Sequence, residues 1–125
     1  MWQTLTAIAA GGAVGSLARY WVSGFVHRKI AGEFPWGTLT VNIAGSLLMG
    51  LLFVLFVERM NVSLETRALV LTGFLGAFTT FSTFSIETLT LLENGAVVKA
   101  MANMVLSVTI CVLAAWVGLM LGRQL

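Results

Sequence analysis

The fold is decided by one stretch, Gly73–Ser85, which reads GFLGAFTTFSTFS. It places glycines, hydroxyl side chains and phenylalanines in the middle of a segment that is otherwise apolar enough to cross a bilayer. A continuous helix that faces lipid gains nothing from Gly, Thr and Ser. A break at membrane depth is tolerated where the freed backbone groups face a cavity or an ion. The stretch therefore predicts a broken helix that lines a cavity or an ion site, and we interpret it as the functional core.

The rest of the composition is that of an integral membrane protein. Of the 125 residues, 58% are hydrophobic and 10% are charged, whereas soluble domains carry roughly 25% charged residues. Four apolar runs approach or exceed the roughly 20 residues that are needed to cross a bilayer. The sequence thus predicts an all-α fold, with a single transmembrane domain over residues 1–125. Its four spans are expected at about residues 2–26, 36–57, 64–92 and 96–121.

The basic residues are divided evenly between the two ends of these spans. An excess of Lys and Arg in short loops normally marks the cytoplasmic side, and here neither side has one. The chain is therefore expected to insert in both orientations and to pair as an antiparallel homodimer. The alternative is that one loop dominates and a single orientation results. No soluble basic surface remains for nucleic acid, and the expected surroundings are membrane lipid. One side carries Arg59, Arg67 and Arg123, and the other carries Arg28, Lys29 and Lys99.

Small and polar residues form a stripe on three of the predicted helices, and each stripe should face protein or water. Asn42 either bonds to a neighbouring helix or offers its amide to a pore, and the pattern alone favours the first. Arg19 either lines a vestibule or reaches toward the interface. The stripes consist of Gly12, Gly15, Ser16, Arg19 and Ser23; of Thr38, Asn42, Gly45, Ser46 and Met49; and of Asn103, Ser107 and Cys111.

The third predicted span is compatible with two kinds of ion chemistry, besides plain packing of its aromatic side chains. Phe78, Phe81 and Phe84 recur at every third residue, and the positive edges of such rings favour a small anion without holding it tightly. Alternatively, Gly73 and Gly76 allow the helix to unwind so that carbonyl oxygens bind a hard cation. Glu87, one turn after Phe84, is expected either to cap this cluster or to pair with Arg19.

Three blocks of the chain resemble the Fluc (CrcB) family of fluoride channels. The resemblance covers essentially the whole chain, because the blocks occur in the same order on four spans and the loop charges are balanced in the same way. The blocks are residues 12–20, GAVGSLARY; residues 37–46, GTLTVNIAGS; and residues 73–84, GFLGAFTTFSTF.

The resemblance implies an antiparallel homodimer with two separate fluoride pathways, each built from both copies. Each pathway would be lined by the aromatic pair Phe81 and Phe84, with Asn42 as an amide donor and Arg19 near an aqueous vestibule. Relatives often carry a tyrosine or another polar residue where this chain has Asn103. Hydroxyl groups would form a polar track for the ion, here Ser82, Thr83 and Ser107.

The resemblance also implies a structural sodium ion (Na+) at the centre of the dimer. Backbone carbonyls at the break in the third helix would coordinate it, and these positions match Gly76 and Thr79 in this chain. Each of the two copies would then contribute ligands to one shared cation.

The expected function is a fluoride-selective channel in the bacterial inner membrane, not an enzyme, that lets cytoplasmic fluoride leave passively and so gives fluoride resistance. The alternative is a small proton-coupled multidrug transporter of the four-span, dual-topology type. Such a transporter needs a carboxylate within the membrane, typically in the first span, where this chain has Arg19 and no acid. A non-conducting assembly subunit is a third possibility, but it leaves the Thr, Ser and Phe run unexplained.

Overall fold

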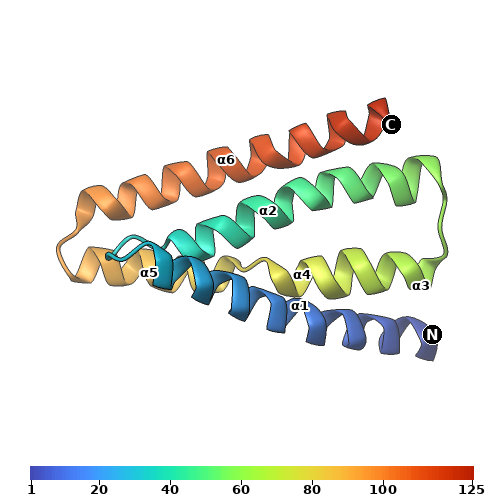
Figure 1. Ribbon diagram of the computed structural model, residues 1–125, viewed down its shortest axis with the longest axis horizontal. Coiled ribbons are helices and arrows are strands. Elements are labelled where there is room, and N and C mark those ends of the chain that lie inside the picture. The colour runs from blue at the N-terminus through green and yellow to red at the C-terminus, as the bar shows by residue number, and fades with distance from the viewer.

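The computed structural model describes residues 1–125 and contains only helices, as predicted. They form four rods that lie side by side, with both chain termini at the same end (Figure 1). The first rod is α1 (Trp2–Lys29), and the second is α2 (Trp36–Phe53) with its π-helical continuation η1 (Val54–Arg59). The third contains α3 (Leu64–Arg67), the π-helical η2 (Ala68–Leu75), α4 (Gly76–Phe78) and α5 (Phe81–Glu93), and the fourth is α6 (Val97–Gln124).

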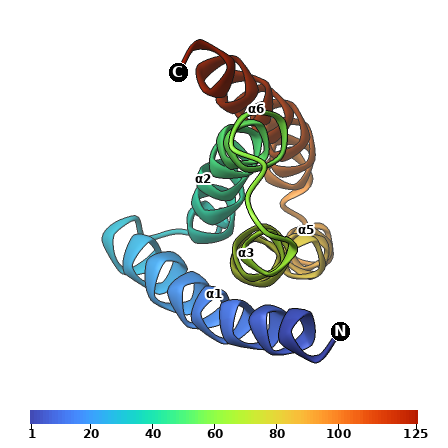
Figure 2. The same ribbon diagram turned by 90° about the vertical axis from the view of Figure 1, so that its right-hand side faces the viewer.

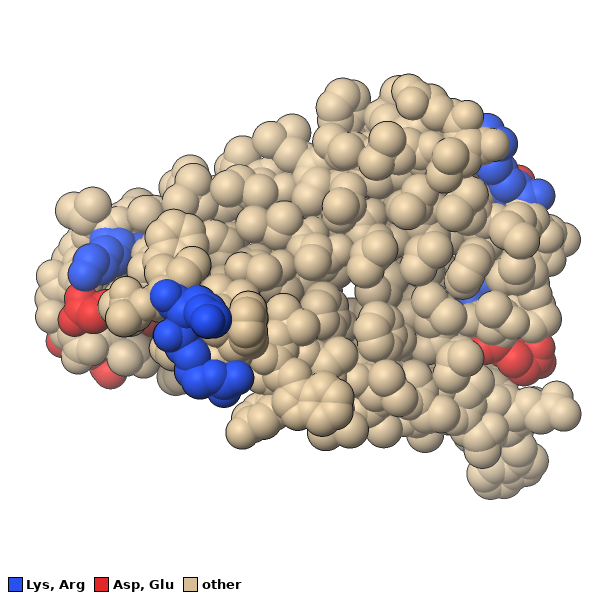
Figure 3. Space-filling model, in the orientation of Figure 1, with Lys and Arg blue, Asp and Glu red and all other residues tan.

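Three of the rods are long and apolar enough to cross a membrane, namely Trp36–Arg59, Leu64–Glu93 and Val97–Gln124. The first rod has the same 28-residue length as α6 but is less apolar. Its role as the fourth span stays a prediction. Charged side chains gather toward the two ends of the molecule in the view of Figure 3 and leave the middle largely uncharged, as expected of helices whose centres lie in hydrocarbon.

The rods are not arranged as a closed bundle. In the end-on view of Figure 2, α1 and α6 lie on opposite sides, with α2 and the third rod between them. Helix α1 packs mainly on η2, and α2 packs mainly on α6. A groove that is partly open to the outside lies between α2, α5 and α6.

Glycines at the contacts allow the helices to approach at backbone distance. A β-carbon on Gly11 would lie 2.0 Å from the Leu69 carbonyl oxygen, and one on Gly15 would lie 2.2 Å from that of Phe74. The same holds between α2 and α6, where a β-carbon on Gly118 would lie 2.2 Å from the Leu47 oxygen. These glycines therefore act by close packing, the usual role of small residues at a membrane helix interface.

We expect Gly15→Ala to destabilise the fold by about 1–3 kcal/mol, because the added methyl must push η2 away from α1. Gly12→Ala is the matched control: a β-carbon there comes no closer than 4.0 Å to its neighbours. Thermal unfolding in detergent should show a lower midpoint for Gly15→Ala and a nearly unchanged one for Gly12→Ala. Equal midpoints for the two variants would contradict this packing.

The predicted break in the third rod is present at Thr79 and Thr80, both of which have extended backbone (Figure 1). Gly73 and Gly76 themselves stay helical, and the helix unwinds three residues after Gly76. Gly76 is helical, with φ −61° and ψ −35°, and Gly73 lies inside η2 against α1. Helix α5 restarts because the Thr80 hydroxyl caps it, accepting a hydrogen bond from the Thr83 backbone amide at 3.2 Å.

The connections between the rods are short. Gly95, with φ +78°, ends α5 in a backbone conformation that glycine adopts easily. Lys99 at the start of α6 pairs with Glu33 of the first connection at 2.7 Å and lowers the pKa of that carboxyl group. Because a lowered pKa favours the charged form, this pairing is present above the ordinary glutamate pKa and is lost on acidification. Its effect is small, since both side chains are exposed.

Candidate functional site

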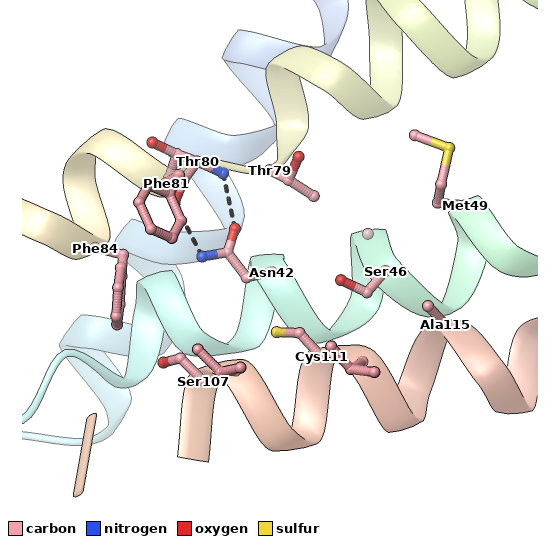
Figure 4. Close-up of a pocket in the computed structure, with 13 residues that line it drawn as sticks. Asn42, Ser46, Met49, Thr79, Thr80, Phe81, Phe84, Ser107, Cys111 and Ala115 are labelled. Atoms are coloured by element: carbon pink, nitrogen blue, oxygen red, sulfur yellow. Dashed lines mark hydrogen bonds between the residues drawn. The ribbon is translucent and has the colours of Figure 1, made fainter. Parts of the chain in front are cut away.

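A groove of about 410 Å³ lies between α2, the break in the third rod, α5 and α6 (Figure 4). Its lining contains amide, hydroxyl, thiol and aromatic groups but no charged side chain. A passage of this kind can interact with an ion through ring edges and single hydrogen-bond donors, without a fixed opposite charge. The lining residues are Asn42, Gly45, Ser46, Met49, Thr79, Thr80, Phe81, Phe84, Ser107, Val108, Cys111, Val112 and Ala115.

Two phenylalanines form one end of the groove. The ring centroids of Phe81 and Phe84 are 5.3 Å apart, and the ring planes are inclined at 46°. Phe84 is 8% exposed, whereas Phe81 is 75% exposed. One ring is therefore held in place by its own chain, and the other is available to a neighbouring molecule.

Asn42 of α2 holds the break in place by two hydrogen bonds (Figure 4). Its amide nitrogen donates to the Thr80 carbonyl at 3.0 Å, and its oxygen accepts from the Thr80 backbone amide at 2.7 Å. The side chain thus satisfies both backbone groups of a residue that has no helical partner for them. The interhelical role that the pattern favoured for Asn42 is confirmed, and one N–H of its amide is committed to this role.

We expect Asn42→Leu to lower the thermal midpoint of the protein in detergent. The change leaves both backbone groups of buried Thr80 unpaired, and each costs about 1–3 kcal/mol. Ser46→Ala is a suitable control, because Ser46 lies one turn further along α2 and lines the same groove. The interpretation fails if the Asn42 and Ser46 variants unfold at the same temperature.

A second, smaller cavity of about 220 Å³ lies on the other side of the break, next to α1. The predicted α1 stripe contributes Ser16, Arg19 and Ser23 to its wall, and no carboxylate lies within ion-pair distance of the Arg19 guanidinium. The cavity is therefore electropositive and rich in hydroxyl groups. The remaining lining residues are Tyr20, Thr38, Val41, Thr80 and Thr83.

Glu87 does not pair with Arg19. Its carboxylate instead accepts a hydrogen bond of 2.5 Å from the Thr38 hydroxyl of α2. The expected alternative of an ion pair with Arg19 is therefore wrong in this chain, because Thr38 lies between α5 and the cavity that holds the guanidinium.

Comparison with known proteins decides the family. Residues 6–119 match the family described as "CrcB-like protein, Camphor Resistance (CrcB)". The chain belongs to the CrcB family. The "Fluoride-specific ion channel FluC" of Magnetococcus marinus is 54% identical to it over 93% of this chain and 94% of its own length. The protein of the same name from Geobacter sulfurreducens is 47% identical over 98% of each.

A longer CrcB relative is similar as well. The "Fluoride-specific ion channel FluC" of Methylococcus capsulatus is 53% identical over 98% of this chain. The chain spans about half the length of that relative, 54%, but nearly the full length of the other two. The resemblance found from the three sequence blocks is therefore confirmed at the level of the CrcB family.

The structure distributes the predicted pathway residues of this CrcB chain over two spaces. The large groove is lined by Asn42, Phe81, Phe84 and Ser107, whereas the small cavity is lined by Arg19 and Thr83. Ser82 lines neither and is exposed on α5. Thr83 and Ser107 therefore do not form one continuous row within a single copy, and the role of Ser82 stays a prediction.

Several residues of the groove were not expected as site residues. Cys111, a member of the predicted stripe on the fourth span, lines the groove together with Ser46 and Met49. The i+4 spacing of Asn103, Ser107 and Cys111 did indicate a shared helix face. What the spacing did not indicate is that Asn103 lies behind this face, buried to 1% exposure.

Proposed function

We propose that this chain forms a fluoride-selective channel in the bacterial inner membrane, through which cytoplasmic fluoride leaves passively down its electrochemical gradient. The observation that carries this conclusion is its identity of 54% and 47%, over nearly full length, with proteins named as fluoride-specific ion channels. The uncharged groove supports it, because its groups suit a small anion that must not be held tightly.

Energetics make a passive pore sufficient for this task. Fluoride enters as the neutral acid, dissociates at the higher internal pH and is trapped as the anion. A potential that is negative inside drives an anion outward by about 2.3 kcal/mol per 100 mV. Neither a nucleotide site nor a proton-coupled carboxylate is required for outward flow.

The ring pair and Asn42 are the proposed contacts for the ion. The edge of a phenyl ring carries partial positive charge, and Phe81 and Phe84 present two tilted rings at one end of the groove. Asn42 uses one amide hydrogen for Thr80, which leaves the second for the ion. Ser107, together with Ser82 and Thr83 on α5, would provide hydroxyl donors in place of lost hydration.

The small cavity is the proposed entry vestibule. An arginine guanidinium without a carboxylate partner attracts anions. The surrounding hydroxyl groups favour the presence of water in the cavity. Arg19 would raise the local fluoride concentration there, without needing to hold the ion inside the narrow passage.

A second copy in the opposite orientation is proposed to complete each pathway. Phe81 is largely exposed, the groove is partly open to the outside and Gly76 lies at the surface. These are features of a face that a partner covers. The balance of three basic residues against three on the two ends allows both orientations to form in the same membrane.

The same face is the proposed site of a structural sodium ion. The carbonyls of residues 76–79 accept no backbone hydrogen bond, because Thr80 donates its amide to Asn42 and α5 restarts at Phe81. Unpaired carbonyl oxygens at the end of a helix suit a hard cation. The residues present therefore fit the ion, with Gly76 and Thr79 as its carbonyl donors from each copy. Sodium would neutralise the partial negative charge of the two helix ends at the dimer axis.

Fluoride efflux from liposomes that contain the purified protein tests this function. Efflux is followed with a fluoride electrode and compared with chloride efflux and with proton-driven uptake of a cationic drug. We expect fast efflux of fluoride alone, unchanged by a proton gradient. Drug uptake driven by protons would favour a multidrug transporter, and liposomes that stay tight to fluoride would leave only an assembly role.

A further inference from the structure

A chain of buried hydrogen bonds lies behind the groove and connects α6 to α5. The Ser107 hydroxyl is 3.2 Å from the Asn103 amide oxygen, and the Asn103 amide nitrogen is 2.8 Å from the Thr88 hydroxyl. The Thr88 hydroxyl is in turn 2.8 Å from the Phe84 carbonyl oxygen. Asn103 is 1% exposed, and Thr88 and Ser107 are nearly as buried.

The Phe84 carbonyl, at the end of this network, fixes the direction of every hydrogen bond in it. The Phe84 carbonyl can only accept, so Thr88 must donate its hydroxyl proton to it. Thr88 then accepts from the Asn103 amide nitrogen, which turns the amide oxygen toward Ser107. Because that oxygen can only accept, Ser107 must donate to it. The Ser107 proton therefore points at Asn103 and not into the groove.

The two ends of this hydrogen-bond network line the groove, whereas its middle does not. Ser107 and Phe84 both line the groove, from α6 and α5 respectively (Figure 4). Asn103 and Thr88 are absent from its wall. Asn103 therefore does not touch an ion in the groove, and its direct hydrogen-bond partner in the groove wall is Ser107.

We propose that Asn103 is a positioning residue that weakens anion binding in the groove by competing with the anion for the Ser107 hydroxyl proton. This inference rests on the proposed channel function. An anion that takes the Ser107 proton leaves the buried Asn103 oxygen without a donor, and burial makes that loss unfavourable. Fluoride can thus bind the Ser107 hydroxyl only by displacing the Asn103 oxygen from it. This weakens binding, as a site requires if the ion must leave as easily as it enters.

The test is the fluoride concentration at half-maximal current, measured on protein in a supported bilayer. Asn103→Leu has a similar volume and no acceptor, so Ser107 is released and fluoride should bind more tightly. We expect the half-maximal concentration to fall about tenfold, the factor that corresponds to one hydrogen bond. In the Ser107→Ala background the same Asn103 substitution should have no effect, because no proton remains to be contested.

Thr88→Val provides a second variant in case Asn103→Leu does not fold. Removing the Thr88 hydroxyl frees the Asn103 amide to turn over, so this variant should also lower the half-maximal concentration without touching the groove. Thr109→Val is the matched control, because it deletes an exposed hydroxyl of α6 that lines neither the groove nor the small cavity.

The outcomes distinguish a failure of the proposed channel function from a failure of the proposed role of Asn103. A wild-type protein that carries no fluoride current overturns the proposed function itself. A normal wild-type current overturns the role of Asn103 if neither substitution lowers the half-maximal concentration. The same conclusion follows if the shift persists when Ser107 is alanine, since a purely structural effect of Asn103 does not depend on the Ser107 hydroxyl.

Discussion

Fluoride flux should fall by at least about tenfold in Phe81→Ile and in Phe84→Ile, while the protein stays assembled. Isoleucine preserves apolar bulk but has no electropositive edge. A loss of about 1.5 kcal/mol in an edge contact corresponds to roughly a factor of ten. Both rings line one end of the groove at 5.3 Å from each other, so each substitution removes one of two contacts. Efflux from liposomes, followed with a fluoride electrode, measures the effect.

Phe53→Ile is the control for this experiment. Phe53 is exposed near the end of α2 and does not line the groove, so its replacement deletes a ring without altering the passage. Size-exclusion chromatography of all three variants establishes that assembly is unchanged. Wild-type flux in both the Phe81 and the Phe84 variant would reduce the two rings to packing residues.

Two added lysines in the first connection should abolish activity when the variant is expressed alone. Ile30 and Ala31 are exposed there, and Ile30→Lys with Ala31→Lys raises the basic residues on that side from three to five, against three on the other. This excess fixes one orientation. If the pathway needs two oppositely inserted copies, a population with one orientation cannot build it, and liposomes should show background flux.

Activity should return when this variant is expressed together with an oppositely biased one. Met60→Lys with Gln124→Lys adds two charges at the other end, where both residues are exposed. The second variant alone serves as the control and should also be inactive. Full activity of either biased form alone would argue against antiparallel assembly.

Much of the fold could be predicted from the sequence because membrane spans depend on composition. The apolar runs mark the rods, and the Gly, Thr and Ser residues in the third run predict a break. The position of the break was harder to predict. It is set by a residue 38 positions away, Asn42, which bonds the Thr80 backbone, and no local pattern in residues 73–85 contains that partner.

The candidate site was predicted as a set of residues but not as two separate spaces. Thr83 and Phe84 are adjacent in sequence, yet successive residues of an α-helix point about 100° apart. Thr83 therefore faces the small cavity beside α1, and Phe84 faces the groove beside α6. The direction of the hydrogen bonds around Asn103 could not be predicted either. It depends on the contact between the Thr88 hydroxyl and the Phe84 carbonyl, which appears only in the folded structure.

The reversal potential of the current tests the central claim most directly, namely that this chain forms a passive pore selective for fluoride. Protein in a planar bilayer is given a tenfold fluoride gradient and an opposite tenfold chloride gradient, at equal pH on both sides. The current should reverse at the fluoride equilibrium potential, about 59 mV from zero, and should not move when a pH gradient is added. Reversal at the chloride potential, or a shift with pH, would contradict the claim.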